Sequence, residues 1–184
     1  MKITAVVVTY NRVNLLKKLI DRLLNQSIRL TNIVIVNNCS GDATFDFLSK
    51  INDERFIISN LDSNLGSAGG FEHGLIKAYN TQSSFIWILD DDGMPEHNAL
   101  ENLIFHLRDG YFHYAACNLV TPDGLQLFDD QISKNKKLNI INCPGGPFNG
   151  ILITRTLLYE VGVPMNRFFI WVEEMEYINR IRES

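Results

Sequence analysis

The sequence predicts an α/β fold with a mostly parallel central sheet and helices on both of its faces. Along the first half of the chain, short runs of β-branched and aliphatic residues alternate with segments whose apolar residues recur every three to four positions. Polar residues follow the apolar runs. Because ligands of such folds bind beyond the carboxyl ends of the parallel strands, these polar residues are expected to meet in one crevice.

The strands expected in this sheet are uninterrupted apolar runs, which is typical of strands buried on both faces. They comprise residues 3–9, 33–36, 56–58 and 85–89. The spacing of leucine and other apolar residues predicts helices between them, over residues 15–24, 43–50, 71–79 and 95–107. The glycine-rich segment from Gly66 to Gly70 is expected to be a loop.

Beyond Tyr114 the alternation is less regular. We expect strands at 115–120 and 148–153, a polar loop at 131–139, and helices at 156–161 and from 173 to the end. No repeat or long linker divides the sequence. With 184 residues and 46% hydrophobic content the chain can bury one core, so a single domain is expected.

Composition excludes several classes of function. The net charge is −4 and no basic run occurs, so nucleic acid is not expected as a partner. The three cysteines lack the spacing of a disulfide framework or a zinc site, which favours a reducing compartment. The N-terminal apolar run is too short for a signal peptide or a membrane span. We therefore expect a cytoplasmic protein.

Asp90, Asp91 and Asp92 directly follow the apolar run at 85–89. Adjacent carboxylates repel one another, and a bound divalent cation would offset that repulsion. Mg²⁺ and Mn²⁺ take oxygen ligands and are commonly held by one or two carboxylates together with substrate phosphates. The alternative is a solvated acidic turn ahead of a helix that begins near Pro95.

Several segments resemble the N-terminal part of inverting family 2 glycosyltransferases of the GT-A fold, nearest to the galactofuranosyl- and rhamnosyltransferase-like members. The similar segments occur in the family's order and span nearly the whole chain: Ile3 to Arg12, Ile35 to Thr44, Asn64 to Phe71, Trp87 to Asp92, Phe148 to Gly150 and Trp171 to Glu176. The resemblance implies one GT-A domain over residues 1–184. Residues 1–113 would bind the nucleotide sugar, and residues 114–184 would form the acceptor side.

The resemblance also implies an activity. A sugar would be transferred with inversion from a nucleoside-diphosphate donor, such as a UDP- or dTDP-sugar, to a glycan or lipid-linked hydroxyl in cell-surface polysaccharide synthesis. The reaction would take place in the cytoplasm, including the inner face of the membrane. Mn²⁺ or Mg²⁺ would be held by Asp92 and Asp90. The residues implied in donor binding are Thr9, Tyr10, Arg12, Asn37, Asn38, Gly69, Asp90 and Asp91.

A second acidic group lies near the C-terminus. Glu174 aligns with the catalytic Asp of the family, so the resemblance implies that it is the base that deprotonates the acceptor, with Glu173 in support. Trp171 and Glu176 would contact the acceptor, Trp171 by stacking on a sugar. The alternative is that these acids only favour the N-terminus of a helix through its dipole.

The sequence departs from the family at two points. Asn37 stands where members usually carry an Asp that binds the base, although an amide can still pair with a uracil edge. The family often completes the metal site with a downstream His, and none follows His113, so we expect a chain truncated at its C-terminus. Two alternatives remain open: a catalytically incomplete nucleotide-sugar-binding domain, and a haloacid-dehalogenase-like phosphatase, which the run Asp90 to Gly93 would suit.

Overall fold

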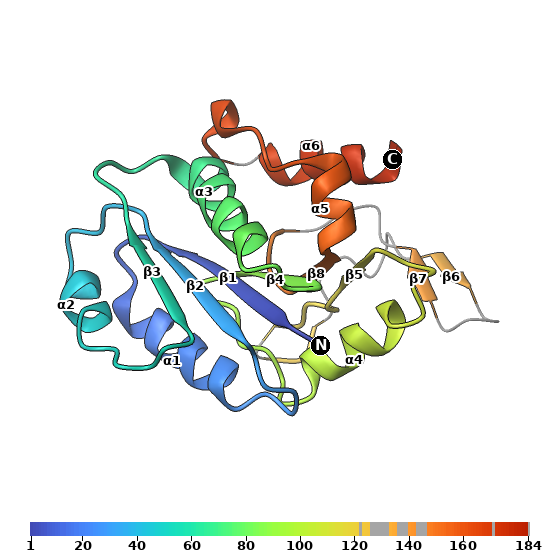
Figure 1. Ribbon diagram of the computed structural model, residues 1–184, viewed down its shortest axis with the longest axis horizontal. Helices are drawn as coiled ribbons and strands as arrows, with labels where there is room; N and C mark the ends of the chain where they lie inside the picture. Colours follow the sequence, from blue (N-terminus) through green and yellow to red (C-terminus); the bar gives the residue numbers. More distant parts are fainter. Residues whose placement is uncertain (122, 126–132, 136–139, 143–146, 171, 184) are drawn as a thin grey trace.

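The computed structural model describes residues 1–121, 123–125, 133–135, 140–142, 147–170 and 172–183, with the backbone alone in 133–135 and 140–142. Its centre is a six-stranded sheet in the order β3-β2-β1-β4-β8-β5 (Figure 1). Four neighbours, β3, β2, β1 and β4, are parallel, and β8 is antiparallel to β4 and β5. The predicted mostly parallel α/β sheet is confirmed. The strands are β1 (Ile3–Thr9), β2 (Asn32–Asn37), β3 (Phe56–Asn60), β4 (Phe85–Asp90), β5 (Tyr114–Ala116) and β8 (Ile151–Thr154).

Helices cover both faces of this sheet (Figure 1). One face carries α1 (Val13–Leu24) and α4 (Ala99–Leu107), and the other carries α3 (Gly66–Asn80), α5 (Arg155–Val161) and α6 (Glu173–Glu183). The remaining elements are α2 (Thr44–Leu48), the 3₁₀ turn η2 (Asn166–Phe168), and a separate antiparallel pair, β6 (Ser133–Asn135) and β7 (Ile140–Asn142).

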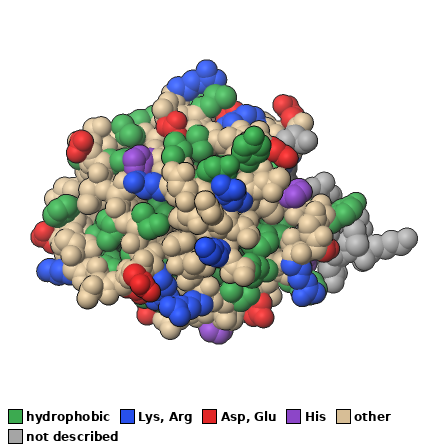
Figure 2. All heavy atoms as spheres, in the orientation of Figure 1, with side chains coloured by type: hydrophobic (Ala, Val, Ile, Leu, Met, Phe, Trp, Pro, Cys, Tyr) green, Lys and Arg blue, Asp and Glu red, His purple; other side chains and the backbone are tan. Residues whose placement is uncertain are grey.

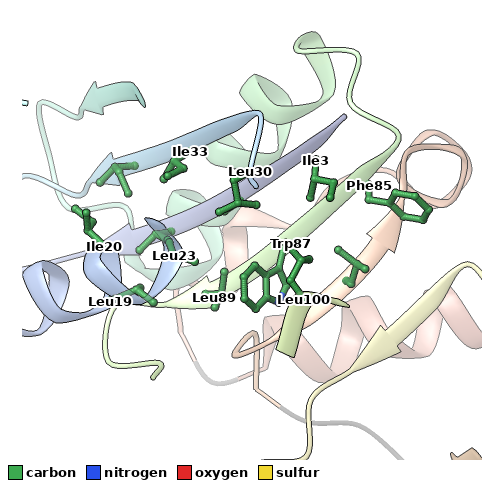
Figure 3. Close-up of a cluster of buried hydrophobic side chains, with 14 of the residues drawn as sticks. Ile3, Leu19, Ile20, Leu23, Leu30, Ile33, Phe85, Trp87, Leu89 and Leu100 are labelled. Atoms are coloured by element: carbon green, nitrogen blue, oxygen red, sulfur yellow. The ribbon is translucent and has the colours of Figure 1, made fainter. Parts of the chain in front are cut away.

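Strand β4 is buried on both faces, as its uninterrupted apolar sequence predicts. Trp87 packs with Leu89, Leu100 of α4 and the leucines of α1 on one side of the sheet, as Figure 3 shows. Ile86 and Ile88 belong to the second core, beneath α3. Each such side chain contributes roughly 1.5–3 kcal/mol on burial. The strand is therefore held firmly on both sides up to the point where its carboxylates begin.

Helix α3 packs unusually close to the sheet. A Cβ atom on Gly70 would lie 2.6 Å from the side chain of Val8, and one on Gly74 would lie 2.6 Å from that of Val6. The expectation that residues 66–70 form a loop is wrong, because Gly66 to Gly70 form the first turns of α3. Glycine has a low helix propensity, but a side chain would clash at each of these positions: at Gly66 with the Phe169 backbone, at Gly69 with Leu65 and at Gly70 with Val8 of β1.

The second half differs from prediction mainly in the extent of its strands. The strand expected at 115–120 is the short β5, the strand expected from 148 begins at Ile151, and the loop expected at 131–139 contains β6. Gly150, at a φ of +89°, turns the chain immediately before β8. Because β8 is antiparallel to β4, this turn lies at the edge of the sheet where β4 ends, and Gly150 N donates to Ile88 O over 2.9 Å.

Candidate functional site

The polar ends of the parallel strands meet at one edge of the sheet. In the strand register, Val8 is opposite Asp90 and Thr9 is opposite Asn37. The Thr9 carbonyl accepts a hydrogen bond of 2.9 Å from Asn38 N, which joins the turns after β1 and β2. The predicted crevice residues of three separate strands are thus neighbours.

The three aspartates at the end of β4 have different surroundings. The Asp91 side chain is buried, and its two oxygens accept bonds from the Thr9 hydroxyl (2.8 Å) and Arg12 Nη1 (3.2 Å). The Asp92 side chain is 48% exposed and accepts a bond from the same Arg12 nitrogen at 3.1 Å. Asp90 is partly buried. The Asp91 carboxylate is therefore occupied in linking the ends of β1 and β4, whereas the Asp92 carboxylate is exposed and accessible to a ligand.

Asp90 experiences the strongest electrostatic strain of the three. Burial, followed by the negative charges of Asp92, Glu174 and Asp91, raises its pKa to about 7. The Arg12 guanidinium opposes this effect only in part. An added cation would relieve the repulsion, so the charge distribution favours one at this edge.

Acidic residues at the start of α6 lie at the same edge. Glu174 Oε1 accepts a bond of 3.4 Å from Phe148 N, and the next residue, Asn149, has its Oδ1 only 2.4 Å from where a Cβ on Gly93 would lie. Glu174 is therefore linked by contacts to the turn that carries Asp92. Burial, and then the charge of Glu173, raise the pKa of Glu174. Such a carboxylate is a better proton acceptor near neutral pH than an ordinary one.

Glu173 is the least satisfied group of the site. Its side chain is buried, and neither carboxylate oxygen has a hydrogen-bond partner among the residues that the structure describes. Buried carboxylates are costly unless they are paired. The negative charge of Glu173 acts on the neighbouring Glu174, whose pKa it helps to raise.

The two asparagines after β2 are engaged in holding loops. Asn38 donates to Asn64 Oδ1 and Gly66 O and accepts from Leu65 N, each over 2.9 Å, so it positions the start of α3. Asn37 donates to Asn60 Oδ1 (2.9 Å) and accepts from Ser40 N (3.1 Å). At 3% exposure, the Asn37 amide offers little surface to a nucleobase in this conformation.

The other predicted site residues are spread around the edge. Tyr10 is 45% exposed beside Asn11, whose φ is +56°. Gly69 is buried in the first turns of α3. Glu176 forms an ion pair with Arg180, with Arg180 Nη2 2.9 Å from Glu176 Oε2. The expected acceptor contact of Trp171 lies outside the described residues.

Sequence reasoning missed the part that Phe169 plays at this edge. Its carbonyl accepts a bond of 3.1 Å from Ala68 N in the first turn of α3, and its backbone has a φ of +60°. A Cβ on Gly66 would lie 2.2 Å from this oxygen. Because phenylalanine rarely adopts a positive φ, the residue at position 169 does not predict this contact. The glycine at position 66 is the residue type that permits such a close approach.

Comparison with known proteins identifies the family. The model of glycosyl transferase family 2 matches residues 4–161. The chain belongs to this family. Galactofuranosyltransferase GlfT1 of Mycolicibacterium smegmatis is 28% identical, over 99% of this chain and 66% of its own length. The present chain thus spans slightly less than two thirds of that relative, and the family assignment excludes the phosphatase alternative.

Two solved structures share the fold of this family 2 chain. S. aureus TarS 1-349 in complex with UDP-GlcNAc has a TM-score of 0.75 at 18% identity, covering 98% of this chain and 53% of its own. Mannosyltransferase PcManGT from Pyrobaculum calidifontis, in complex with GDP-Man and Mn²⁺, has a TM-score of 0.72 at 18% identity, covering 98% and 51%. The expected GT-A fold is confirmed.

The described part of the family 2 chain has oxygen ligands suited to a divalent cation, but it does not form a complete metal cage. Within the described residues, no group of three or more His, Cys, Asp or Glu side chains is placed to hold a metal ion. Asp92 is exposed and next to the strained Asp90. Mg²⁺ and Mn²⁺ are often held by one or two carboxylates with substrate phosphates supplying the rest, so these residues fit that mode of binding.

The surface adds two observations. On the face shown in Figure 2, the Lys and Arg side chains of the described residues are scattered, and some lie next to Asp or Glu side chains. No helix in the described part of the chain is both long enough and apolar enough to span a bilayer.

Proposed function

We propose that this family 2 protein is an inverting glycosyltransferase that uses a nucleoside-diphosphate sugar, a UDP- or dTDP-sugar, and a divalent cation. The acceptor is a glycan or lipid-linked hydroxyl in cell-surface polysaccharide synthesis, reached in the cytoplasm or at the inner face of the membrane. One observation carries the proposal: Glu174 at the start of α6 lies beside the end of β4, where it accepts a bond from Phe148 N next to Asn149, whose side chain faces Gly93.

The donor side rests on Asp92, Asp90 and Arg12. Asp92, with Asp90 behind it, would hold Mn²⁺ or Mg²⁺. When bound, the cation offsets the negative charge that develops on the departing diphosphate. Arg12 is paired with Asp92 and with the neighbouring Asp91, and it carries a guanidinium, whose planar fork matches phosphate oxygens. The complex of PcManGT with GDP-Man and Mn²⁺, which has this fold, supports the assignment.

The acceptor side rests on Glu174. The acceptor oxygen bonds to the anomeric carbon on the face opposite the diphosphate, the bond from that carbon to the phosphate oxygen breaks, and the acceptor proton passes to Glu174. A positioned base contributes about 10²–10⁴-fold to such a step. The raised pKa of Glu174 and the bond that Phe148 N makes to its carboxylate suit it to this role.

The proposal is tested by calorimetry with UDP in the presence and absence of Mn²⁺, together with hydrolysis of UDP-sugars over time. Asp92→Asn should abolish metal-dependent UDP binding. Glu174→Gln should bind UDP as the wild type does and lose at least about 100-fold in turnover. Glu183→Gln, the same change at an exposed position in the last turn of α6, is the matched control and should alter neither.

Three outcomes separate the alternatives. If Glu174→Gln lost UDP binding, the assignment of the base would be wrong. If wild-type protein bound UDP with Mn²⁺ but turned over no donor, the catalytically incomplete nucleotide-sugar-binding domain would be correct. If it bound no nucleotide at all, the donor site itself would be refuted.

A further inference from the structure

One nitrogen of Arg12 is shared by two carboxylates of different character. Arg12 Nη1 lies 3.2 Å from Asp91 Oδ1 and 3.1 Å from Asp92 Oδ2. The arginine is fixed at its backbone, because its carbonyl accepts the amides of Leu15 and Leu16 at the start of α1. Its side chain is 52% exposed, so the guanidinium can move although the backbone cannot.

The two bonds of this guanidinium differ in strength. The Asp91 side chain is 6% exposed and is also held by the Thr9 hydroxyl, so the bond from Arg12 to Asp91 is partly buried and firmly oriented. The bond to Asp92 is exposed on both sides, at 52% and 48%. Exposed ion pairs contribute little, typically a few-fold in an equilibrium constant. Arg12 thus has one secure anchor and one exchangeable partner.

The exchangeable partner is the carboxylate that the proposed function assigns to the metal. A cation and a guanidinium compete for Asp92, since both need its lone pairs and repel each other. A diphosphate resolves the competition because it offers Arg12 paired phosphate oxygens, which bind guanidinium by two parallel hydrogen bonds. Arg12 can give up Asp92 while keeping Asp91.

We propose that Arg12 is an exchangeable counter-cation of Asp92. When the metal and the diphosphate bind, the metal takes the place of Arg12 on Asp92, and the Arg12 guanidinium binds the phosphate oxygens instead. The inference rests on the proposed function and deepens it. Before the donor arrives, Arg12 lowers the affinity of Asp92 for the metal; afterwards it raises the affinity for the diphosphate. Metal and nucleotide therefore bind cooperatively, and by linkage each increases the affinity of the other by the same factor.

The test measures Mn²⁺ binding by electron paramagnetic resonance, without nucleotide and with saturating UDP. Arg12→Met, which keeps the stem and removes the charge, should bind Mn²⁺ alone about three- to fivefold more tightly than the wild type. In the presence of Mn²⁺ it should bind UDP at least about tenfold more weakly. Misfolding cannot produce these opposite shifts.

Arg55→Met is the matched control. Arg55 is likewise an arginine in an ion pair with an aspartate, although a partly buried one, 2.6 Å from Asp53 on the segment that leads into β3. Its variant should bind Mn²⁺ and UDP as the wild type does. Arg12→Lys, which keeps a point charge without the fork, should leave metal affinity near the wild-type value and still weaken UDP.

The result that overturns the inference is an Arg12→Met protein whose affinity for Mn²⁺ alone is unchanged or lower, or whose affinity for UDP is unchanged. An equal increase in Mn²⁺ affinity in Arg55→Met would also overturn the inference, since the increase would then come from the change in net charge of the protein. Failure of the proposed donor site looks different, because wild-type protein would then bind no UDP with or without Mn²⁺. Failure of the proposed catalysis would leave both binding measurements intact and abolish only donor turnover.

Discussion

Replacing Asp90 by asparagine should stabilise the metal-free protein, and increasingly so as the pH rises. The Asp90 pKa is raised from 3.8 to about 7, chiefly by burial. A carboxyl group with a higher pKa in the folded than in the unfolded chain binds its proton more tightly when folded, so its ionisation destabilises the fold. The destabilisation is absent below 3.8, grows up to about pH 7, and is complete above it.

The rise from 3.8 to about 7 corresponds to roughly 4 kcal/mol at about pH 8, which is an upper bound because water and small shifts of the site screen the charge. We expect Asp90→Asn to raise the free energy of unfolding by about 2 kcal/mol there, and by less than about 1 kcal/mol near pH 5. Urea unfolding with EDTA across this range measures both values. The same variant should lose metal-dependent UDP binding.

Asp62→Asn provides the control for this experiment, because Asp62 is exposed in the loop between β3 and α3. Its effect should remain within about 0.5 kcal/mol at every pH. A gain from Asp90→Asn that is the same at about pH 5 and about pH 8 would refute the reasoning, since an isosteric change that acts through charge must follow the titration of the carboxyl group.

Three further predictions concern the fold around the site. Gly66→Ala should lower the free energy of unfolding by about 3 kcal/mol or more, because φ is positive there and the new Cβ would clash with Phe169 O. Gly110→Ala, at a similar φ with no described atom within reach of the Cβ, should cost only about 1–2 kcal/mol in urea unfolding, and equal losses would exclude the clash. Asn38→Ala should cost about 2–3 kcal/mol in the same assay because its loop bonds are lost, and a loss below about 0.5 kcal/mol would contradict that role. Ellman's reagent should modify exposed Cys39 well before Cys117, whose pKa burial raises to about 11; mass mapping of the peptides would expose the error if both reacted together.

The sequence predicts the strands of this fold better than its contacts. The run from Phe85 to Leu89 identifies β4 because continuous hydrophobicity leaves no other place for it than the middle of a sheet. The sequence does not predict the start of α3, because the low helix propensity of Gly66, Gly69 and Gly70 argues against a helix, whereas close contacts with Phe169, Leu65 and Val8 leave no room for side chains there. Local preference and tertiary packing disagree here, and packing prevails.

The sequence predicts which residues belong to the candidate site, but it does not predict which of them are buried and hydrogen-bonded and which are exposed to a ligand. Nothing in three consecutive aspartates distinguishes the one that faces Thr9 from the one left open; the register of β1 against β4 decides this. The amides of Asn37 and Asn38 likewise acquire their partners from loops distant in sequence. Long-range pairing of this kind depends on the assembled sheet.

The insertion of β8 between β4 and β5 has a consequence for how the protein can be divided. A fragment ending at residue 113 would contain β1 to β4 and their helices, yet it would expose the side of β4 that β8 pairs with and would leave Ala68 N without the Phe169 carbonyl. An uncovered strand edge of that kind invites association between copies. A shorter protein made to test the proposed donor site should therefore keep β8 and the turn at Phe169.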